Sequence, residues 1–546
     1  MAGRATVLRG GGVYDGQRHL PGHGAVVVDG LVVAVAPDAD LDVPAGAEQV
    51  DLAGGLLLPG FQDAHVHPVQ GGLERIRCDL SGLSTREEYL AAVARYAAEH
   101  PEREWVLGGG WSMTAFGPAG PTAADLDAVV PDRPVFLPNR DRHGAWVSSR
   151  ALELAGVDRH TPDPADGRLD RGPDGTPTGS LHEGAMSLVE RLLPVTGDEE
   201  LLEALLVAQA HLHSFGITAW QDAILGDYAG LRDVTPTYLR AAASGELTAR
   251  VRGALWWDRE RGLEQVEELV ERRRSTSAHP RFVPGTVKVM QDGVAENGTA
   301  AMSAPYLDRC GGPTHNHGLS FVDPLVLWEA VVRLDAAGFQ VHVHAIGDRA
   351  VGEALDAFAQ ARRVNGAADL RHHIAHVQVI HPDDRPRFAD LAVAANMQPL
   401  WAAFDEQMTE LTLPFLGPER SRWQYPFADL ARAGARLVAG SDWPVSSPDP
   451  LQGIHVAVNR WVHGASGVEG SEAFLPEQAL STAEAFAAYT SGSAHVNHLD
   501  DTGVLAPGLA ADLAVLDRDP FAGDPAGIGS TRVVATYVEG QAVYRA

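Results

Sequence analysis

Short apolar and β-branched runs alternate with amphipathic segments through the middle of this chain. Eight such runs, each bounded by turn residues, predict buried β-strands at 58–67, 216–223, 249–257, 285–293, 339–348, 370–379, 391–399 and 435–444. Segments between them, such as "PLVLWEAVVRLDAAG" and "DRAVGEALDAFAQARR", carry apolar residues at helical spacing. Eight strands alternating with helices predict a (β/α)8 TIM barrel of the α/β class, with catalytic residues at the C-terminal ends of its strands.

The two ends of the chain have a different pattern, in which short strands turn at glycine. "AVVVDGLVVAVAP" suits a hairpin around Asp29 and Gly30, and the last segment turns at Glu539 and Gly540. Residues 1–57 and 503–546 are therefore predicted to form one composite β-sandwich, which leaves 58–502 for the barrel. About 145 residues separate the first two barrel strands, too many for a structureless loop. Residues 69–210 are predicted to be a folded insertion, or lid, over the barrel mouth.

Composition and charge exclude several classes of partner. The chain has 43 Lys and Arg against 72 Asp and Glu, a formal net charge of −29, which argues against nucleic acid and anionic membranes. No run approaches the length of a membrane span, and the N-terminus lacks the apolar core of a signal peptide. Cys78 and Cys310 are the two cysteines, so we expect reduced thiols rather than a disulfide framework. These features predict a cytoplasmic enzyme with a small-molecule substrate, and base rates favour a homodimer.

Metal-competent side chains recur at the ends of five predicted strands. His65 and His67 are two residues apart, so on a strand they share a face. This pair alone is weak, because the chain holds 23 histidines. Further candidates lie at later strand ends: Lys288, Asp292, His342, His344, His372, His373, His376 and Asp442. Taken singly, each could be a core histidine, a lysine reaching the rim or a turn cap. Their joint occurrence around one barrel predicts a metal site.

Several motifs resemble those of a known family. "PGFQDAHVHP", "HAIGD", "HIAH" and "GSDWPV" are similar to motifs of the metal-dependent amidohydrolase superfamily. "VKVMQDGVAENGTAAMSAPY", "VHVHAIGDRAV" and "GSDWPVSSPDPLQGI" resemble its amidohydrolase family 3 branch, which includes YtcJ-like proteins and N-substituted formamide deformylase. "ALSTAEAFAAYTSGSA" and the segment after it resemble the closing part of that branch. The resemblance covers nearly the whole chain. It implies a (β/α)8 barrel with a small β-sandwich built from both chain ends.

The resemblance also implies a ligand set. His65, His67 and Asp442 would hold the more buried cation, and His344 and His376 would hold a second one. His344 is preferred to the neighbouring histidine at 342, and His376 to those at 372 and 373, because each lies closer to the C-terminal end of its strand. His342 shares a face with His344 and is a candidate supporting residue.

Lys288 would bridge the two cations as a carbamate formed with CO2, because an ammonium group has no lone pair to offer a metal. The ligand set suits two Zn²⁺ ions per chain, and Mn²⁺, Fe²⁺ or Ni²⁺ would also fit. Zinc lowers the pKa of bound water to about 7, which gives a hydroxide able to attack an amide carbonyl. Asp442 is expected to act as general base and then general acid.

The substrate pocket is predicted only coarsely. His143, Glu183 and Trp111 in the insertion, together with Asp292, are candidate substrate-binding residues, with His143 expected to approach the substrate carbonyl. An equal alternative is a structural role for His143, in which its side chain forms a hydrogen bond that stabilises the lid. Tryptophans near the mouth favour a substrate with an apolar or aromatic group.

The favoured function is hydrolysis of a non-peptide amide bond, such as that of an N-substituted formamide or an acylated amine. The alternatives on the same site are a mononuclear deaminase and an ester, lactone or carbamate hydrolase. A non-catalytic barrel module is the least favoured alternative, because every expected ligand type is present.

Overall fold

A computed structural model describes residues 5–228, 230–276, 279–464 and 472–546. Its centre is an eight-stranded parallel sheet in the order β21-β20-β19-β18-β17-β16-β15-β8. The strands are β8 (Phe61–Val66), β15 (Ile217–Leu225), β16 (Arg250–Trp256), β17 (Phe282–Met290), β18 (Gln340–Ala345), β19 (His373–His376), β20 (Ala394–Met397) and β21 (Leu437–Ala439). All eight predicted strands are present, which confirms the α/β barrel.

Helices cover the outside of the barrel. They include α1 (Pro68–Ile76), α6 (Asp198–Ser214), α7 (Thr235–Ser244), α8 (Gln265–Ser275), α9 (Pro324–Ala336), α10 (Asp348–Asn365), α11 (Arg385–Leu391), α13 (Phe427–Arg432) and α14 (Pro450–Asn459). Local chemistry starts α9, because the Asp323 side chain accepts the Leu325 N–H and Pro324 occupies the first helical turn. The face of α10 that carries Val351, Leu355 and Phe358 is buried in the main hydrophobic core. The helices therefore hold the strand ends in place.

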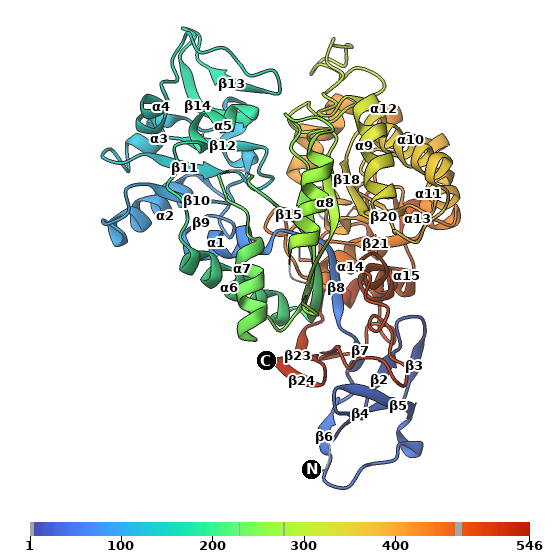
Figure 1. The fold of residues 1–546 in the computed structure, drawn as a ribbon. Coiled ribbons are helices and arrows are strands. Elements are labelled where there is room, and N and C mark those ends of the chain that lie inside the picture. Colours follow the sequence, from blue (N-terminus) through green and yellow to red (C-terminus); the bar gives the residue numbers. More distant parts are fainter. Residues whose placement is uncertain (1–4, 229, 277–278, 465–471) are drawn as a thin grey trace.

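A second sheet forms a lid beside the barrel mouth, at the upper left of Figure 1. Its order is β13-β14-β12-β11-β10-β9. The strands are β9 (Cys78–Asp79), β10 (Val106–Gly109), β11 (Val135–Pro138), β12 (Gly144–Val147), β13 (Gly167–Arg171) and β14 (Pro177–Glu183). The helices packed with them are α2 (Arg86–Glu99), α3 (Ala123–Asp127), α4 (Ser149–Ala155) and α5 (Ser187–Glu190). Two hydrophobic clusters of its own stabilise this sheet.

Both chain ends meet in two small sheets in the lower part of Figure 1. One sheet has the order β5-β4-β1-β6 and the other β24-β23-β22-β7-β2-β3. The strands are β1 (Ala5–Arg9), β2 (Gly12–Tyr14), β3 (His19–Pro21), β4 (His23–Val28), β5 (Leu31–Pro37), β6 (Glu48–Asp51), β7 (Leu56–Pro59), β22 (Leu513–Leu516), β23 (Val533–Val538) and β24 (Gln541–Arg545). Gly60 alone separates β7 from the first barrel strand, so this β-unit is joined directly to the strand that carries His65.

Two further observations bear on the sequence-based expectations. Cys78 is buried and Cys310 exposed, and both are free thiols. In the described part of the chain, no helix combines the length and the apolar character that crossing a bilayer requires.

Candidate metal centre

The six predicted metal ligands line one cavity of about 60 Å³ at the C-terminal ends of the barrel strands. They are His65 on β8, His67 directly after β8, Lys288 on β17, His344 on β18, His376 on β19 and Asp442 after β21. Three of them converge most tightly: one ligand atom each from His65, His376 and Asp442 lies within 4.8 Å of the others. The barrel thus brings together groups that lie far apart in the sequence.

Asp442 is the centre of this arrangement. Its Oδ1 lies 3.2 Å from His65 Nε2 and 3.0 Å from His67 Nε2, and its Oδ2 lies 4.0 Å from His376 Nδ1. The Asp442 N–H donates to the His65 carbonyl at 2.8 Å, which joins the last barrel strand to the first. His376 and Asp442 have φ values of 78° and 56°, in a region that side chains other than glycine rarely adopt. Such strain is typical of functional sites, where the surrounding structure must hold it.

His376 lies between the two predicted cation positions. Its ring centroid is 4.8 Å from that of His65 and 4.4 Å from that of His344. Trp401 stacks on its other side, with ring planes 3° apart and centroids separated by 5.4 Å. Its Nδ1 is buried and has no hydrogen-bond partner among the described residues, so this nitrogen is available to a cation.

Lys288 lies in the same cavity with a side chain that is nearly fully buried. Burial lowers the pKa of its ammonium group to about 7, although Asp442 partly opposes this shift. A substantial fraction of Lys288 is therefore the neutral amine near neutral pH, which is the form that reacts with CO2.

A hydrogen-bond chain beneath the cavity fixes the proton positions on His65. Gln340 donates its amide N–H groups to the backbone carbonyls of Arg371 and Val496, so its Oε1 must accept from Gln221 Nε2 at 3.0 Å. Gln221 Oε1 is thereby directed at His342 Nδ1, 2.7 Å away. This amide oxygen can only accept, so His342 carries its proton on Nδ1.

The same chain indicates that a cation belongs at the site. Burial holds the pKa of His342 well below its usual range, so its Nε2 is bare and accepts from His65 Nδ1 at 2.9 Å. Burial and the charge of Lys288 lower the pKa of His65 to about 3, so its Nε2 carries a lone pair. That lone pair faces Asp442 Oδ1 at 3.2 Å. Two lone pairs at this separation repel unless a positive ion lies near both, and the donor set therefore fits a divalent metal.

His143 reaches the metal cavity from the lid. Its Nδ1 lies 3.0 Å from both carboxylate oxygens of Glu183, and Thr299 donates to the same carboxylate at 2.8 Å. Burial alone would lower the pKa of His143, but the Glu183 charge outweighs it and raises the pKa to about 9. The ring is therefore cationic at neutral pH. With Nδ1 directed at Glu183, its Nε2–H is the group free to act in the cavity that His143 lines.

The other predicted substrate-binding residues lie elsewhere. Asp292 is fully buried and accepts the N–H groups of Ala301, Ile346 and Gly347 at 2.8–3.0 Å, so it fixes the loops behind His344. Glu183 acts on the cavity through His143. Trp111 lines a separate, larger cavity of about 430 Å³ between lid and barrel.

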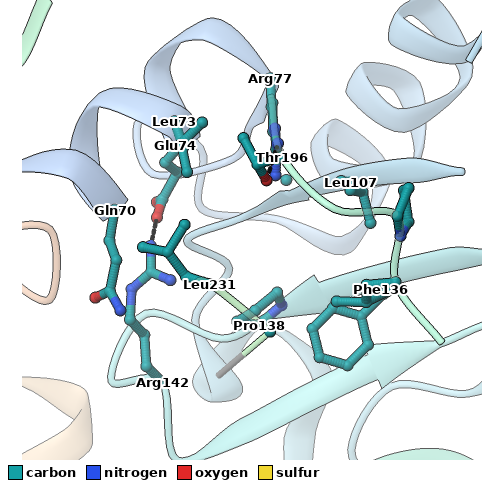
Figure 2. A pocket seen from close by; sticks show the side chains of 14 residues that line it. Gln70, Leu73, Glu74, Arg77, Leu107, Phe136, Pro138, Arg142, Thr196 and Leu231 are labelled. Atoms are coloured by element: carbon teal, nitrogen blue, oxygen red, sulfur yellow. Dashed lines mark hydrogen bonds and ion pairs between the residues drawn. The ribbon is translucent and has the colours of Figure 1, made fainter. Parts of the chain in front are cut away.

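Sequence reasoning missed Arg142 and Gln70, which line both the metal cavity and a neighbouring cavity of about 70 Å³. Figure 2 shows the Arg142 guanidinium directed at Glu74 on α1, with which it forms an ion pair. Arg142 has a φ of 62°, and its position next to His143 in "DRHGAW" was the available signal. Gln221 was also missed. Its signal was a polar residue inside the otherwise apolar strand "GITAWQDA".

Known proteins share this architecture over nearly the whole chain. The sequence profile described as "Amidohydrolase family" matches residues 48–544. The putative amidohydrolase YtcJ of Bacillus subtilis is 32% identical over 91% of this chain and 90% of its own. Protein LONG AFTER FAR-RED 3 of Arabidopsis thaliana is 32% identical over 98% of this chain and 91% of its own. N-substituted formamide deformylase of Arthrobacter pascens is 25% identical over 93% of this chain and 90% of its own.

The fold also matches a solved structure. An uncharacterized metal-dependent hydrolase from Pyrococcus furiosus superimposes with a TM-score of 0.71 and 27% identity, covering 94% of this chain and 99% of that one. The profile match, the relatives at 32% identity and the convergence of the strand-end histidines agree. This chain belongs to the amidohydrolase family.

Proposed function

We propose that this protein is a metal-dependent hydrolase that cleaves the carbon–nitrogen bond of a small, non-peptide amide. The observation that carries the proposal is the convergence of His65, His376 and Asp442 in a cavity that Lys288 and His143 also line. The resulting donor set, imidazole nitrogens and carboxylate oxygens, is one that Zn²⁺ prefers in hydrolases.

The chain's own residues have complementary tasks in this reaction. A divalent cation bound here supplies a Lewis acid and lowers the pKa of water, to about 7 in the case of Zn²⁺. Asp442 takes the proton of the attacking water and passes it to the leaving nitrogen, so that the amine departs neutral. The cationic His143 donates its Nε2–H to the carbonyl oxygen, where negative charge develops. Glu183 positions His143 and keeps it protonated.

Lys288 is proposed to hold two cations as a carbamate. The neutral amine attacks CO2, a C–N bond forms as one C=O π bond breaks, and one proton of the resulting nitrogen-protonated adduct is released to water to leave the carbamate. The lowered pKa of Lys288 supports this step, because it keeps part of the population neutral at pH 7. The competing proposal is a single cation with an unmodified lysine, as in a mononuclear deaminase. The close grouping of a single set of three donors, His65, His376 and Asp442, favours this single-cation arrangement.

The size of the metal cavity supports a small acyl group. A volume of about 60 Å³ is enough for water and a formyl or acetyl carbonyl. One relative is named for the deformylation of N-substituted formamides. We therefore propose N-formyl and N-acetyl amines as the substrates to test first.

The decisive experiment combines metal content, mass and activity. Protein purified without chelators is assayed for metal per chain, for intact mass with and without bicarbonate, and for turnover of N-formylbenzylamine, phenyl acetate and adenosine. Two equivalents of metal, a mass gain of one CO2 that Lys288→Arg abolishes, and amine release support the proposal. One equivalent with an unmodified lysine and ammonia release from adenosine would replace it with the deaminase. A protein that binds no metal would overturn both.

A further inference from the structure

The cavity of about 430 Å³ lies next to the metal cavity but shares none of its lining residues. Residues close together in the sequence line one cavity or the other. His143 and Val294 line the metal cavity, whereas Gly144 and Glu296 line the larger one. The larger cavity is within the usual range for small-molecule sites, whereas the metal cavity is far below it. We call this second, larger space the chamber.

The chamber has an apolar wall. Leu411 and Phe415, from the segment that follows β20, are partly exposed, and the buried side chains of Trp111 and Leu181 lie behind the lining on the lid side. Trp111 is 3% exposed and its Nε1 donates to the Leu137 carbonyl, so it supports this wall from within the lid core. Aromatic and aliphatic faces of this kind bind a hydrocarbon chain or ring.

Among the side chains that line the chamber, carboxylates outnumber guanidinium groups. Asp170 is engaged by Arg168 and His182, at 3.4 and 2.9 Å. Glu406 and Glu410 line the chamber one helical turn apart, and neither forms an ion pair with any described residue. The opposing charge is Arg309, which lies over the Phe415 ring with its guanidinium carbon 5.9 Å from the centroid.

Two further acceptors lie closer to the metal cavity. Glu296 accepts the Thr412 hydroxyl at 3.0 Å, which connects it to the segment that carries Glu410. Asn297 is about nine-tenths buried and donates its Nδ2 to the His143 carbonyl at 3.2 Å. This bond directs its Oδ1 the other way, and among the described residues that oxygen has no hydrogen-bond partner. The chamber thus offers acceptors and negative charge to a ligand that carries N–H donors.

We propose that the chamber binds the amine half of the substrate, and that this half is an apolar chain or ring with a cationic group at its far end. The inference rests on the proposed function for the position of the acyl group. A monoacylated diamine satisfies both cavities: its small acyl group lies by the metals, its hydrocarbon part against Leu411 and Phe415, and its ammonium group near Glu406 and Glu410.

The test is calorimetric binding of hexamethylenediamine and of 6-aminohexanol, which replaces the far ammonium with a hydroxyl of similar size. The full chain is used with its metals, and again after chelation. We expect the diamine to bind at least about fivefold more tightly than the amino alcohol at low salt, with the difference lost in 0.5 M NaCl. Glu406→Gln combined with Glu410→Gln should remove the difference. Glu419→Gln, an exposed glutamate of the same region outside the chamber, should preserve it.

Equal binding of the two compounds, a difference that survives the double variant, or no binding of either would each overturn the chamber assignment. Turnover of N-formylbenzylamine reports separately on the proposed function, because that substrate has no far cation. Loss of its turnover with normal diamine selectivity would refute the amide hydrolase and retain an amine-binding chamber.

Discussion

Two backbone carbonyls determine which nitrogen of His65 faces the metal site. The carbonyls of Arg371 and Val496 orient the amide of Gln340, which orients Gln221, and Gln221 in turn selects the tautomer of His342. Gln340, Gln221 and His342 are each buried, and the hydrogen bonds of their side chains are made within this chain and to its immediate neighbours. Tautomer selection of this kind raises the affinity of a histidine for metal, because no proton has to be moved before the ion binds.

Removing Gln221 should therefore weaken metal binding without removing any ligand. We expect Gln221→Leu to lower Zn²⁺ affinity about tenfold or more, measured by competition with a chromogenic chelator. Gln62→Leu is the matched control, since Gln62 is equally buried but bonds to Thr502 and Asn497. Both variants should lose folding stability, and only the first should lose affinity. Unchanged affinity in Gln221→Leu would refute the relay.

The pair of His143 and Glu183 should make stability depend on pH. The folded pKa of His143 is about 9 against an unfolded value of 6.5, so the stabilisation is complete below pH 6.5 and is lost as the pH rises through 9. The shift corresponds to about 3 kcal/mol. Urea unfolding should show His143→Gln far less stable than the parent at pH 6 and close to it at pH 10. His160→Gln, at an exposed lid histidine, should show no such trend.

The barrel strands were predictable because parallel strands are buried on both faces and read as continuous apolar runs. Strand β18 is fully buried from Gln340 to Ala345, and its two histidines stand out against that background. Strand order then follows from the β-helix-β connections, which bring the histidine-bearing ends to one rim. Local patterns therefore sufficed for the fold and for the candidate residues at the strand ends, whereas the division of these residues into a ligand set came from the resemblance to the family.

The lid could not be predicted to the same depth. Its strands β9 and β10 have two and four residues, and pairings such as Gly144 with His182 join segments that no local signal connects. The hydrogen bond of His143 with Glu183 depends on that pairing. The chamber forms where the lid meets two barrel segments, the loop after β17 and the segment after β20, so its lining required the tertiary structure.

The ion pair of Arg142 with Glu74 helps to join the lid to the barrel, as does that of Asp166 with Arg259. Arg142 comes from the turn between β11 and β12, and Glu74 from α1; Glu74 is 5% exposed. We expect Glu74→Gln to cost about 2 kcal/mol of unfolding free energy, because a buried guanidinium would lose its counter-charge. Hydrogen exchange should quicken across β11 and β12. Glu153→Gln breaks an exposed pair with Arg150 on α4 and should change neither quantity. An unchanged unfolding free energy and unchanged hydrogen exchange across β11 and β12 in Glu74→Gln would contradict this role.

The β-unit made by the two chain ends supports the metal site through covalent and ionic links. Strand β7 is paired with β2 and β22 inside that unit and continues through Gly60 into β8, which carries His65. Arg250 at the start of β16 reaches across the same boundary. Its Nε lies 2.8 Å from Asp512, and its Nη2 lies 3.0 Å from Glu539. The barrel floor and the β-unit therefore form one connected structure.

This boundary should govern the stability of the whole molecule. Asp512 is 2% exposed and burial raises its pKa, so without Arg250 its carboxylate would be buried and unpaired. We expect Arg250→Met to cost about 3 kcal/mol in urea unfolding, and Asp512→Asn in the same chain to restore most of it, since the second change removes the uncompensated charge. Arg240→Met, which breaks an exposed pair with Glu199, should leave the unfolding free energy nearly unchanged. If the double variant is as unstable as the sum of the two single ones, the pair is not coupled. The β-unit would then be held to the barrel by the β7–β8 continuity and apolar packing alone.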